Sequence, residues 1–537
     1  MHTNADTPKT TESHSRFMLL FLLFTALVCG AMIMVVEVLG SRVIGPFFGV
    51  SLFVWTSLIT VTLVALALGY AIGGRFADRR GTADYLYGII LLAGLAVLLI
   101  PVYKMAVLKL CVPLGLRLGA FVSASLLFGP SLFLLGCVSP LLVKIAVREM
   151  KNIGRTVGGF YAISTIGSVI GTVVTGFVLI AYLGVNSIFH LVGLSLCLLA
   201  LGYFILIRRA WWMTLGLIVV FLFPSGQPGV LPSVQSAYGQ QVSLIAHHDS
   251  YYGSLKVIDY QDQRVHNRDM LIDGLMQGSI DVVSGESIEA FSYFMTLLPY
   301  ALNPDMDNAL VIGLGAGLVP NWLEKRGIQT DAVDIDPAVF DFAERYFNVR
   351  LSGRKVKQDA RYFLQNSLDV YDLVVLDAFT GDSTPGHLVS LEALQLVEKR
   401  LSDQGILAVN LIIDSSANNY MAASVVKTLE QVFDQVQAFR TVGPQQSPGI
   451  ENLALIAYRG EERIPDESYL NPNSIAHQVR RQVMDNIYRR FEFPDDTAAI
   501  ILTDDYNPLD VFDIATREEL RRRILEHSEW DILGYSG

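Results

Sequence analysis

The chain has 537 residues, of which 52% are hydrophobic, and a formal net charge of −11. Its mean hydropathy of +0.42 excludes an ordinary soluble enzyme, because such proteins do not carry so large an apolar excess. The acidic balance disfavours nucleic acid as a partner and suits a cationic substrate.

The apolar excess lies in the first 225 residues, where most hydrophobic runs exceed the ~18 residues that can cross a bilayer as a helix. These runs cover residues 17–39, 51–72, 85–102, 119–143, 157–183 and 187–207, with a shorter run at 211–224. We therefore expect residues 1–225 to form a multi-span α-helical membrane domain of seven or eight helices in a lipid bilayer. The first run lacks a small-residue cleavage site, so it is predicted to remain as an anchor.

Basic residues fall on alternate loops between these predicted helices, which places the N-terminus inside. They gather at residues 9–16, 75–80, 144–155 and 208–209. Seven spans would leave the C-terminal half outside, whereas nucleotide co-substrates are cytosolic. We therefore favour an even count, with residues 104–118 or the short last run as the miscounted region. Lys104, Lys109 and Arg117 also sit awkwardly in an outer loop. The expected location is the cell inner membrane, with a cytoplasmic catalytic domain.

The soluble half begins after a segment rich in Gly, Pro, Ser and Gln, residues 226–241, which is predicted to be a linker. Residues 242–290 contain short alternating runs and turn signals that indicate a small β lid. The four cysteines, at positions 29, 111, 137 and 197, all lie in the membrane half. The soluble half therefore has no disulfide framework and no cysteine-based zinc site, and we expect no metal.

Helical and strand patterns alternate over residues 291–462, which predicts a doubly wound, Rossmann-like α/β sheet. The predicted strands include ALVIG, TDAVDI, YDLVVLDAF, GILAVNLII and ENLALIAYR. Ligands of such sheets bind beyond the carboxyl ends of the strands. Residues 463–537 are charged and are predicted to form a helical extension.

A glycine-rich turn follows the first of these strands, in the sequence ALVIGLGAGLVPNWLEKRGIQTDAVDID. Gly313, Gly315 and Gly317 allow a sharp turn and a close approach of the backbone to a ligand. Asp334 follows about 20 residues later, where an acid can hold ribose hydroxyls. Position 318 is Leu, so the loop is G-x-G-x-G, which favours an S-adenosylmethionine-type ligand over NAD. Close packing without a ligand is the alternative for such a turn.

Further acidic residues follow successive strands. Asp359, with the backbone at Ala360, is placed to contact an adenine edge. Asp377 ends an apolar strand, where desolvation would raise its pKa and suit a general base or an amine ligand. Asp382 lies in the loop beyond. Aspartate also caps helices and turns, so each position alone is ambiguous, whereas four acids at successive strand ends favour a site.

Several motifs together resemble the spermidine synthases, or polyamine aminopropyltransferases, over residues 250–460. MLIDGLMQGS resembles a family segment whose glutamine binds nucleotide, here Gln277. VIGLGAG, VDID, QDA and YDLVVLDAFTGD resemble the family's glycine loop, ribose acid, adenine contact and catalytic loop. The whole chain resembles membrane-fused members, in which a sequence such as LTDDYNPLD (502–510) follows the domain.

The resemblance implies a methyltransferase-like catalytic domain that transfers an aminopropyl group from decarboxylated S-adenosylmethionine to a diamine such as putrescine. Asp377 would deprotonate the attacking amine, and Glu286 and Asp382 would contact the substrate. The sulfonium supplies the electrophile, so neither a metal nor a tightly bound cofactor is implied. A homodimer is left open.

The sequence departs from the family at two places. Ala316 stands where the glycine loop usually carries an acid for the donor's amino group. In GESIEAF, Glu286 matches the family's D-E-x-x-Y-H-E helix, but Glu289, Ala290 and Phe291 replace its Tyr-His-Glu. These departures keep open a methyltransferase that uses ordinary S-adenosylmethionine and another acceptor.

A third interpretation is a membrane transporter with a nucleotide- or polyamine-sensing domain. Glu37 lies inside the first hydrophobic run, where an acid is costly and is a candidate substrate or proton site. Alternatively, Glu37 lies near the membrane interface or pairs with Arg42.

Overall fold

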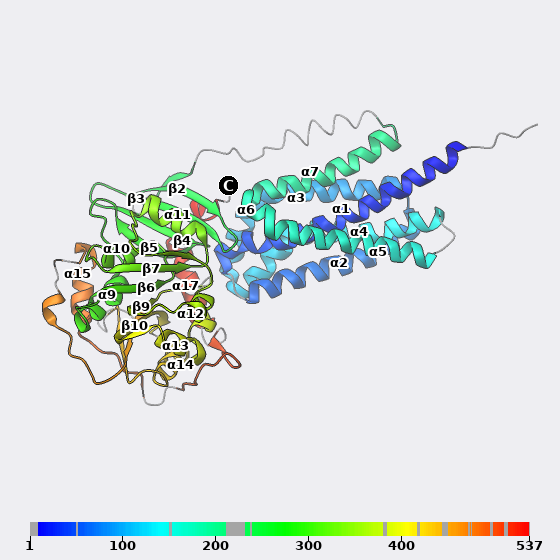
Figure 1. Cartoon of the computed structure of the whole chain (residues 1–537). Coiled ribbons are helices and arrows are strands. Elements are labelled where there is room, and N and C mark those ends of the chain that lie inside the picture. The colour runs from blue at the N-terminus through cyan, green and yellow to red at the C-terminus, as the bar shows by residue number, and fades with distance from the viewer. Residues whose placement is uncertain are drawn as a thin grey trace, which may run out of the picture. The chain divides into compact units, whose positions relative to one another are not determined.

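The structure is a computed structural model. It describes residues 9–49, 52–149, 153–210, 231–236, 239–379, 384–415, 419–442, 449–470, 473, 475–494, 498–509 and 514–535. The chain divides into two compact units, Met1–Val230 with the last two residues, and Leu231–Tyr535. The first is helical and the second contains both sheets (Figure 1).

The helical unit contains six helices, among the described residues, that are long and apolar enough to span a membrane. They are α1 (Lys9–Phe48), α2 (Leu52–Arg80), α3 (Ala83–Cys111), α4 (Leu116–Glu149), α5 (Ile153–Val174) and α7 (Val185–Gly202). The 3-10 turn η1 (Val112–Leu114) follows α3. The π-helical η2 (Thr175–Leu179) and α6 (Ile180–Tyr182) extend α5, and η3 (Tyr203–Ile207) extends α7. The predicted run at 211–224 lies outside the described residues, so the count of seven or eight helices stays a prediction.

The third helix extends beyond the apolar run of residues 85–102 and includes Lys104 and Lys109. Both residues lie inside α3, which continues past Pro101 to Cys111. The Lys104 ammonium is buried and donates a hydrogen bond to Asn186 Oδ1 of α7 at 2.9 Å. A hydrogen-bonding partner on a neighbouring helix therefore lets a lysine remain within a helix that hydropathy alone would have ended earlier.

The lid is a five-stranded antiparallel sheet in sequence order. Its strands are β1 (Ser233–Gln235), β2 (Gln241–Asp249), β3 (Ser254–Gln261), β4 (His266–Ile272) and β5 (Leu275–Asp281). β1 pairs with β2, so residues 233–235 belong to the sheet and not to the predicted linker. Asp273 and Gly274 both have positive φ, as a two-residue turn between β4 and β5 requires.

The main sheet has seven strands in the order β11-β12-β10-β9-β6-β7-β8. They are β6 (Asn308–Ile312), β7 (Gln329–Asp334), β8 (Lys355–Lys357), β9 (Tyr371–Leu376), β10 (Leu401–Asp414), β11 (Gln435–Arg440) and β12 (Ile450–Tyr458). The neighbours from β10 to β8 pair in parallel, while β12 is antiparallel to β10 and β11. The strand order reverses between β6 and β9, which is where a ligand is expected to bind.

Helices cover both faces of this sheet, as its near-continuous apolar strands require. α9 (Ala290–Leu302), α10 (Leu318–Glu324) and α15 (His477–Asn486) share one apolar core with the sheet. α12 (Ala360–Asn366), α13 (Leu391–Glu398) and α14 (Tyr420–Leu429) share the other. α11 (Pro337–Tyr346) packs with the lid. This arrangement confirms the predicted α/β fold.

The predicted C-terminal extension is helical in part. It contains η6 (Glu467–Tyr469), α15, α17 (Ile514–His527) and α18 (Trp530–Leu533). Ile532 packs on the lid with Val242, Leu244 and Ile258. The buried Arg521 of α17 also donates to the Asp273 carbonyl at 2.9 Å. The extension therefore completes the core of the lid.

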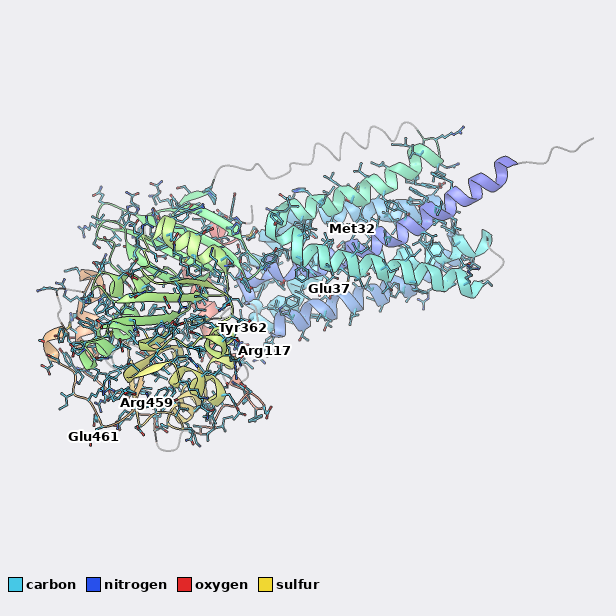
Figure 2. All side chains as sticks on the ribbon, viewed as in Figure 1. Met32, Glu37, Arg117, Tyr362, Arg459 and Glu461 are labelled. Carbon is cyan, nitrogen blue, oxygen red and sulfur yellow. The ribbon has the colours of Figure 1, made fainter. Side chains whose placement is uncertain are left out.

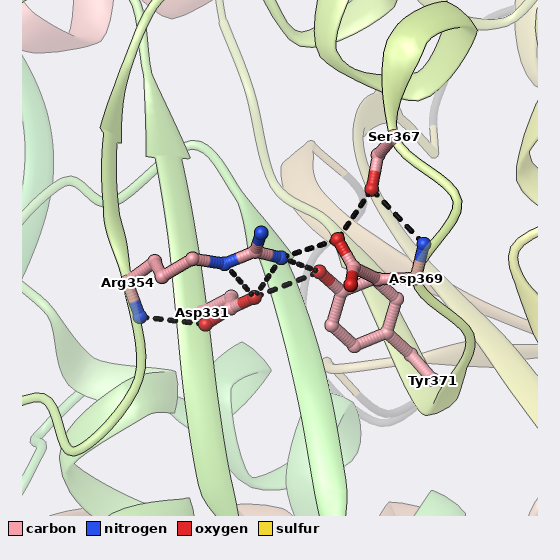
Figure 3. Close-up of polar contacts among 5 residues, drawn as sticks. All are labelled: Asp331, Arg354, Ser367, Asp369 and Tyr371. Carbon is pink, nitrogen blue, oxygen red and sulfur yellow. Dashed lines mark hydrogen bonds and ion pairs between the residues drawn. The ribbon is translucent and has the colours of Figure 1, made fainter.

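A charged network fixes the edge of the main sheet where its strands begin (Figure 3). The Arg354 guanidinium contacts Asp331 of β7 at 2.7 Å and Asp369 at 2.6 Å. The Tyr371 hydroxyl of β9 donates to Asp331 at 2.8 Å. Because this network lies at the start of β9, the carboxyl ends of the strands remain available for a ligand.

Candidate active site

An open cavity of about 170 Å³ lies beyond the carboxyl ends of β6, β7 and β9. Seven predicted site residues line it, namely Gln277, Gly313, Gly315, Asp334, Asp359, Ala360 and Asp377. The topology thus brings together residues that are up to 100 positions apart in the sequence, from Gln277 to Asp377.

The glycine loop connects β6 to α10 with all three glycines at positive φ. A Cβ on Gly313 would lie 2.9 Å from the Ala378 Cα, and a Cβ on Gly315 would lie 2.8 Å from the Gln277 carbonyl oxygen. Gly317 starts α10 in the left-handed conformation and does not line the cavity. The first two glycines therefore let the cavity wall close tightly, and the third shapes the turn into the helix.

Asp334 ends β7 and accepts two backbone hydrogen bonds. The Leu314 and Asp336 amides each donate to its carboxylate at 2.9 Å. Burial nevertheless raises the pKa of Asp334 to about 6. These bonds fix the carboxylate beside the glycine loop, in the position expected for a ribose contact.

Asp336 belongs to the same wall, although no role was predicted for it. Its carboxylate caps α11 through the Ala338 amide at 2.9 Å. It also accepts a hydrogen bond from the Ser250 hydroxyl of the lid at 2.5 Å. Tyr252, two residues further along the lid, lines the cavity. Asp336 therefore fixes the lid against the nucleotide side of the cavity.

Asp377 follows β9 at the floor of the cavity. Burial raises its pKa to about 6, and a hydrogen bond from Asn410 opposes that rise. The Asn410 amide donates to Asp377 Oδ1 at 2.8 Å, and Asn452 donates to Asn410 Oδ1 at 3.0 Å. The two asparagines, on β10 and β12, hold the carboxylate in one orientation. Sequence analysis missed them, because only the AVNLII pattern, with one polar residue in a buried strand, marks Asn410.

Asp359 caps α12 by accepting a hydrogen bond from the Tyr362 amide at 2.8 Å. Its other carboxylate oxygen lies 3.5 Å from His387 Nε2, and both residues line the cavity. The side chain is thus available at the edge where adenine is expected.

A C-terminal segment supports the loop that carries His387. The Arg361 guanidinium donates to the His387 carbonyl at 2.8 Å and to Asp504 Oδ1 at 2.6 Å. Asp504 also accepts from Ser390 at 2.7 Å, and Asn507 donates to the Gly386 carbonyl at 2.8 Å. Residues 504–507 belong to the LTDDYNPLD motif, so this motif stabilises one wall of the cavity through hydrogen bonds.

Of the two predicted substrate contacts, only Glu286 lies in the part of the chain that the structure describes. The Glu286 carboxylate pairs at 2.8 Å with Lys325, which follows the last residue of α10, and Glu286 does not line the cavity. Asp382 lies outside the described residues. Glu289 does not line the cavity either; burial, and then the nearby Asp269, raise its pKa to about 7.

Ala316 points away from the cavity. It is buried in an apolar cluster with Leu314, Leu318 and Val349. A Cβ on Gly278 of β5 would lie 2.8 Å from its methyl group. The position where related loops carry an acid is therefore filled by packing against the lid.

The strand order, the glycine loop and the acids at the strand ends define a methyltransferase-like α/β domain with a nucleotide-type pocket. Residues 290–458 match the family described as the spermine/spermidine synthase domain.

Curated relatives include both aminopropyl and methyl transferases. The chain is 35% identical over 154 residues to an N-terminal histidine N-methyltransferase of Emericella nidulans, which covers 28% of this chain and 27% of the relative. It is 28% identical to the polyamine aminopropyltransferase of Vibrio vulnificus, over 50% of this chain and 91% of the relative. The chain thus spans about a quarter of the first relative and most of the second.

Solved structures of two kinds are similar. A probable spermidine synthase from Corynebacterium glutamicum is 15% identical, with a TM-score of 0.35 over 44% of this chain and 82% of its own. Human methyltransferase-like protein 13 in complex with SAH is 20% identical, with a TM-score of 0.27 over 38% of this chain and 92% of its own. The order and direction of the strands define the fold independently of these similarities.

Proposed function

We propose that the soluble unit transfers an aminopropyl group from decarboxylated S-adenosylmethionine to a diamine such as putrescine. The observation that carries this proposal is the Asp377 carboxylate, held by Asn410 at the floor of a nucleotide-type cavity in a spermine/spermidine synthase domain. The acidic chain also suits a cationic acceptor.

The adenosine part of the donor would occupy the wall that contains the glycine loop. Asp334 would accept hydrogen bonds from the ribose hydroxyls, and Asp359 with the Ala360 backbone would contact the adenine edge. Gln277, on β5 of the lid, would contact the nucleotide from the opposite side. Held in this way, the sulfonium carbon would face Asp377.

The attacking amine must be deprotonated, because a protonated amine has no free electron pair on its nitrogen. Asp377 would accept that proton, and its pKa of about 6 makes it a stronger base than an exposed aspartate. The amine nitrogen then forms a bond to the carbon next to sulfur, the carbon–sulfur bond breaks, and its electron pair stays on sulfur as methylthioadenosine leaves. Positioning of the two reactants supplies much of the rate enhancement.

A second candidate function is N-methyl transfer from ordinary S-adenosylmethionine. Two observations favour it: the 35% identity to an N-methyltransferase, and Ala316, which leaves no acid in the glycine loop to select a donor without a carboxylate. Asp377 would have the same role, because here too an amine attacks a carbon bonded to a sulfonium.

We place the catalytic unit on the cytoplasmic side of the inner membrane. The six described spans form an even number, and the basic groups at 75–80, 144–155 and 208–209 then lie on the side of the N-terminus. Decarboxylated and ordinary S-adenosylmethionine are both cytosolic, which agrees with a catalytic unit on the cytoplasmic side.

The test is product analysis with the full-length protein in lipid nanodiscs. Each donor is incubated with putrescine, and methylthioadenosine and S-adenosylhomocysteine are quantified. Aminopropyl transfer predicts amine-dependent methylthioadenosine release, abolished by Asp377→Asn and retained by Asp305→Asn, which changes an exposed aspartate outside the cavity. Release of S-adenosylhomocysteine alone would replace this proposal with methyl transfer, and no turnover of either donor with a panel of amines would refute both.

A further inference from the structure

The close helix contacts of the membrane unit occur in two matching sets. Gly167 and Gly171 of α5 are so close to α1 that a Cβ on either would clash with the α1 backbone, at Leu27 and Ala31. Two glycines of α2, also four residues apart, approach α4 in the same way. A Cβ on Gly69 would lie 2.5 Å from the Phe133 carbonyl oxygen.

The second glycine of α2 and the facing glycines complete the two sets. A Cβ on Gly73 would lie 2.7 Å from the Cys137 Cα. On the facing helices, Gly30 of α1 meets Ser164 of α5, and Gly136 of α4 meets Gly69 of α2. In one set a single glycine of α1 faces two glycines of α5, and in the other a single glycine of α4 faces two glycines of α2. In each set the two helices run parallel.

A third close pair, α3 and α7, is symmetric in itself. A Cβ on Gly94 would lie 2.9 Å from the Gly193 carbonyl oxygen, and a Cβ on Gly193 would lie 2.9 Å from the Gly94 carbonyl oxygen. If α1 is exchanged with α4, α2 with α5 and α3 with α7, the contacts of α1 with α5 become those of α4 with α2, and the contact between α3 and α7 is unchanged. Because each repeat has three helices, the second crosses the membrane in the opposite direction, as in inverted-repeat transporters.

The first helices of the two repeats, α1 and α4, contact each other, and a small cavity of about 20 Å³ lies between them and α5. Its walls include Ile33 of α1, Ser139 of α4, and Phe160, Tyr161 and Ser164 of α5. In transporters with inverted repeats, substrate sites lie at the repeat interface near the bilayer midplane. This cavity lies at the corresponding interface.

Glu37 continues the face of α1 that lines the cavity. Ala26, Cys29, Gly30 and Ile33 line it, and Glu37 follows one turn after Ile33. Glu37 lies along the length of the bundle and not at one of its ends (Figure 2). An acid at such a position is costly unless it serves a ligand or a proton.

The two other acids of the described spans are near helix ends and are paired. Asp78 contacts Lys144 at 2.7 Å, and Asp84 contacts Arg208 at 3.2 Å. Among the described residues, neither Arg42 nor any other group pairs with the Glu37 carboxylate. Within the described membrane spans, Glu37 is thus the one carboxylate without a counter-ion, and it follows a cavity with apolar, aromatic and hydroxyl walls.

We propose that the membrane unit is an inverted repeat of two three-helix units, and that a protonated organic amine binds between α1 and α4 with Glu37 as its counter-ion. The carboxylate neutralises the ammonium, the rings of Phe160 and Tyr161 suit a cation, and the apolar walls accept its carbon chain. This site is independent of the chemistry proposed for the soluble unit.

The test is equilibrium binding of labelled spermidine and putrescine to the full-length protein in nanodiscs. Asp377→Asn is used as the background, so that the soluble site contributes least. We expect Glu37→Gln to weaken amine binding at least tenfold, Glu37→Asp to retain it, and the Glu461→Gln control, which changes a side chain of the soluble unit, to leave it unchanged.

Transfer activity is measured on the single Glu37→Gln variant, and we expect it to be retained, which also shows that the variant folds. Equal amine affinity in the background protein and its Glu37→Gln form would overturn the proposal, as would a cavity that retains phospholipid and binds no amine. Loss of all transfer activity with intact, Glu37-dependent binding would refute only the function of the soluble unit.

Discussion

The hydrogen bond from Asn410 to Asp377 makes a quantitative prediction about the pH dependence of the reaction. Asn410→Leu keeps a similar volume on β10 but removes the amide that donates to the Asp377 carboxylate at 2.8 Å. A hydrogen bond to a charged group contributes about 1.5–3 kcal/mol, and one pKa unit corresponds to about 1.4 kcal/mol. Asn410 is 2% exposed, so solvent does not replace the lost donor. The pKa of Asp377 should therefore rise from about 6 by about one to two units.

Only ionised Asp377 can accept the proton of the amine, so the rate falls as the pH drops below its pKa. A higher pKa moves the acidic limb of kcat/KM to higher pH by the same one to two units. The measurement is the pH profile of product release between about pH 5.5 and 9.5 for both proteins.

Asn452→Leu is the matched control. It removes the amide that donates to Asn410 but leaves Asn410 beside Asp377. We expect its acidic limb to move by less than half a unit. An Asn410→Leu enzyme whose limb stays in place, while Asp377→Asn is inactive, would refute the assignment of that limb to Asp377.

Three further predictions concern the cavity wall, the C-terminal motif and the lid. Gly313→Ala puts a Cβ at a position with φ of 87°, against the backbone after β9, and should abolish donor binding measured by calorimetry. Asp504→Asn weakens the contact with Arg361 and should raise KM for the donor several-fold in steady-state kinetics, whereas Asp505→Asn, at an exposed neighbour, should not. Glu289 has its pKa raised from 4.5 to about 7, so its contribution to stability is full below pH 4.5 and is lost as the pH rises through 7, by about 3 kcal/mol. Glu289→Gln should therefore reduce the drop in melting temperature between pH 5 and pH 8, and an unchanged drop would contradict this assignment.

Much of the nucleotide wall could be predicted from the sequence because its signals are local. The spacing of Gly313, Gly315 and Gly317 fixes a turn after an apolar strand, and the rule that parallel strands end at one edge brings Asp334 and Asp377 to the same place. The apolar runs similarly identified the six described membrane helices, since hydrophobic length is a local property.

The tertiary structure alone decided which polar groups meet across the sheet. Asn410 and Asn452 reach Asp377 from neighbouring strands, and Asp504 reaches Arg361 from more than 140 residues away. Glu286 matches a motif but turns to Lys325, and Lys104 remains inside a helix because Asn186 pairs with it. Such partners depend on packing between distant segments, whereas the sequence by itself determined the local turns, the helices and the edge of the sheet where they converge.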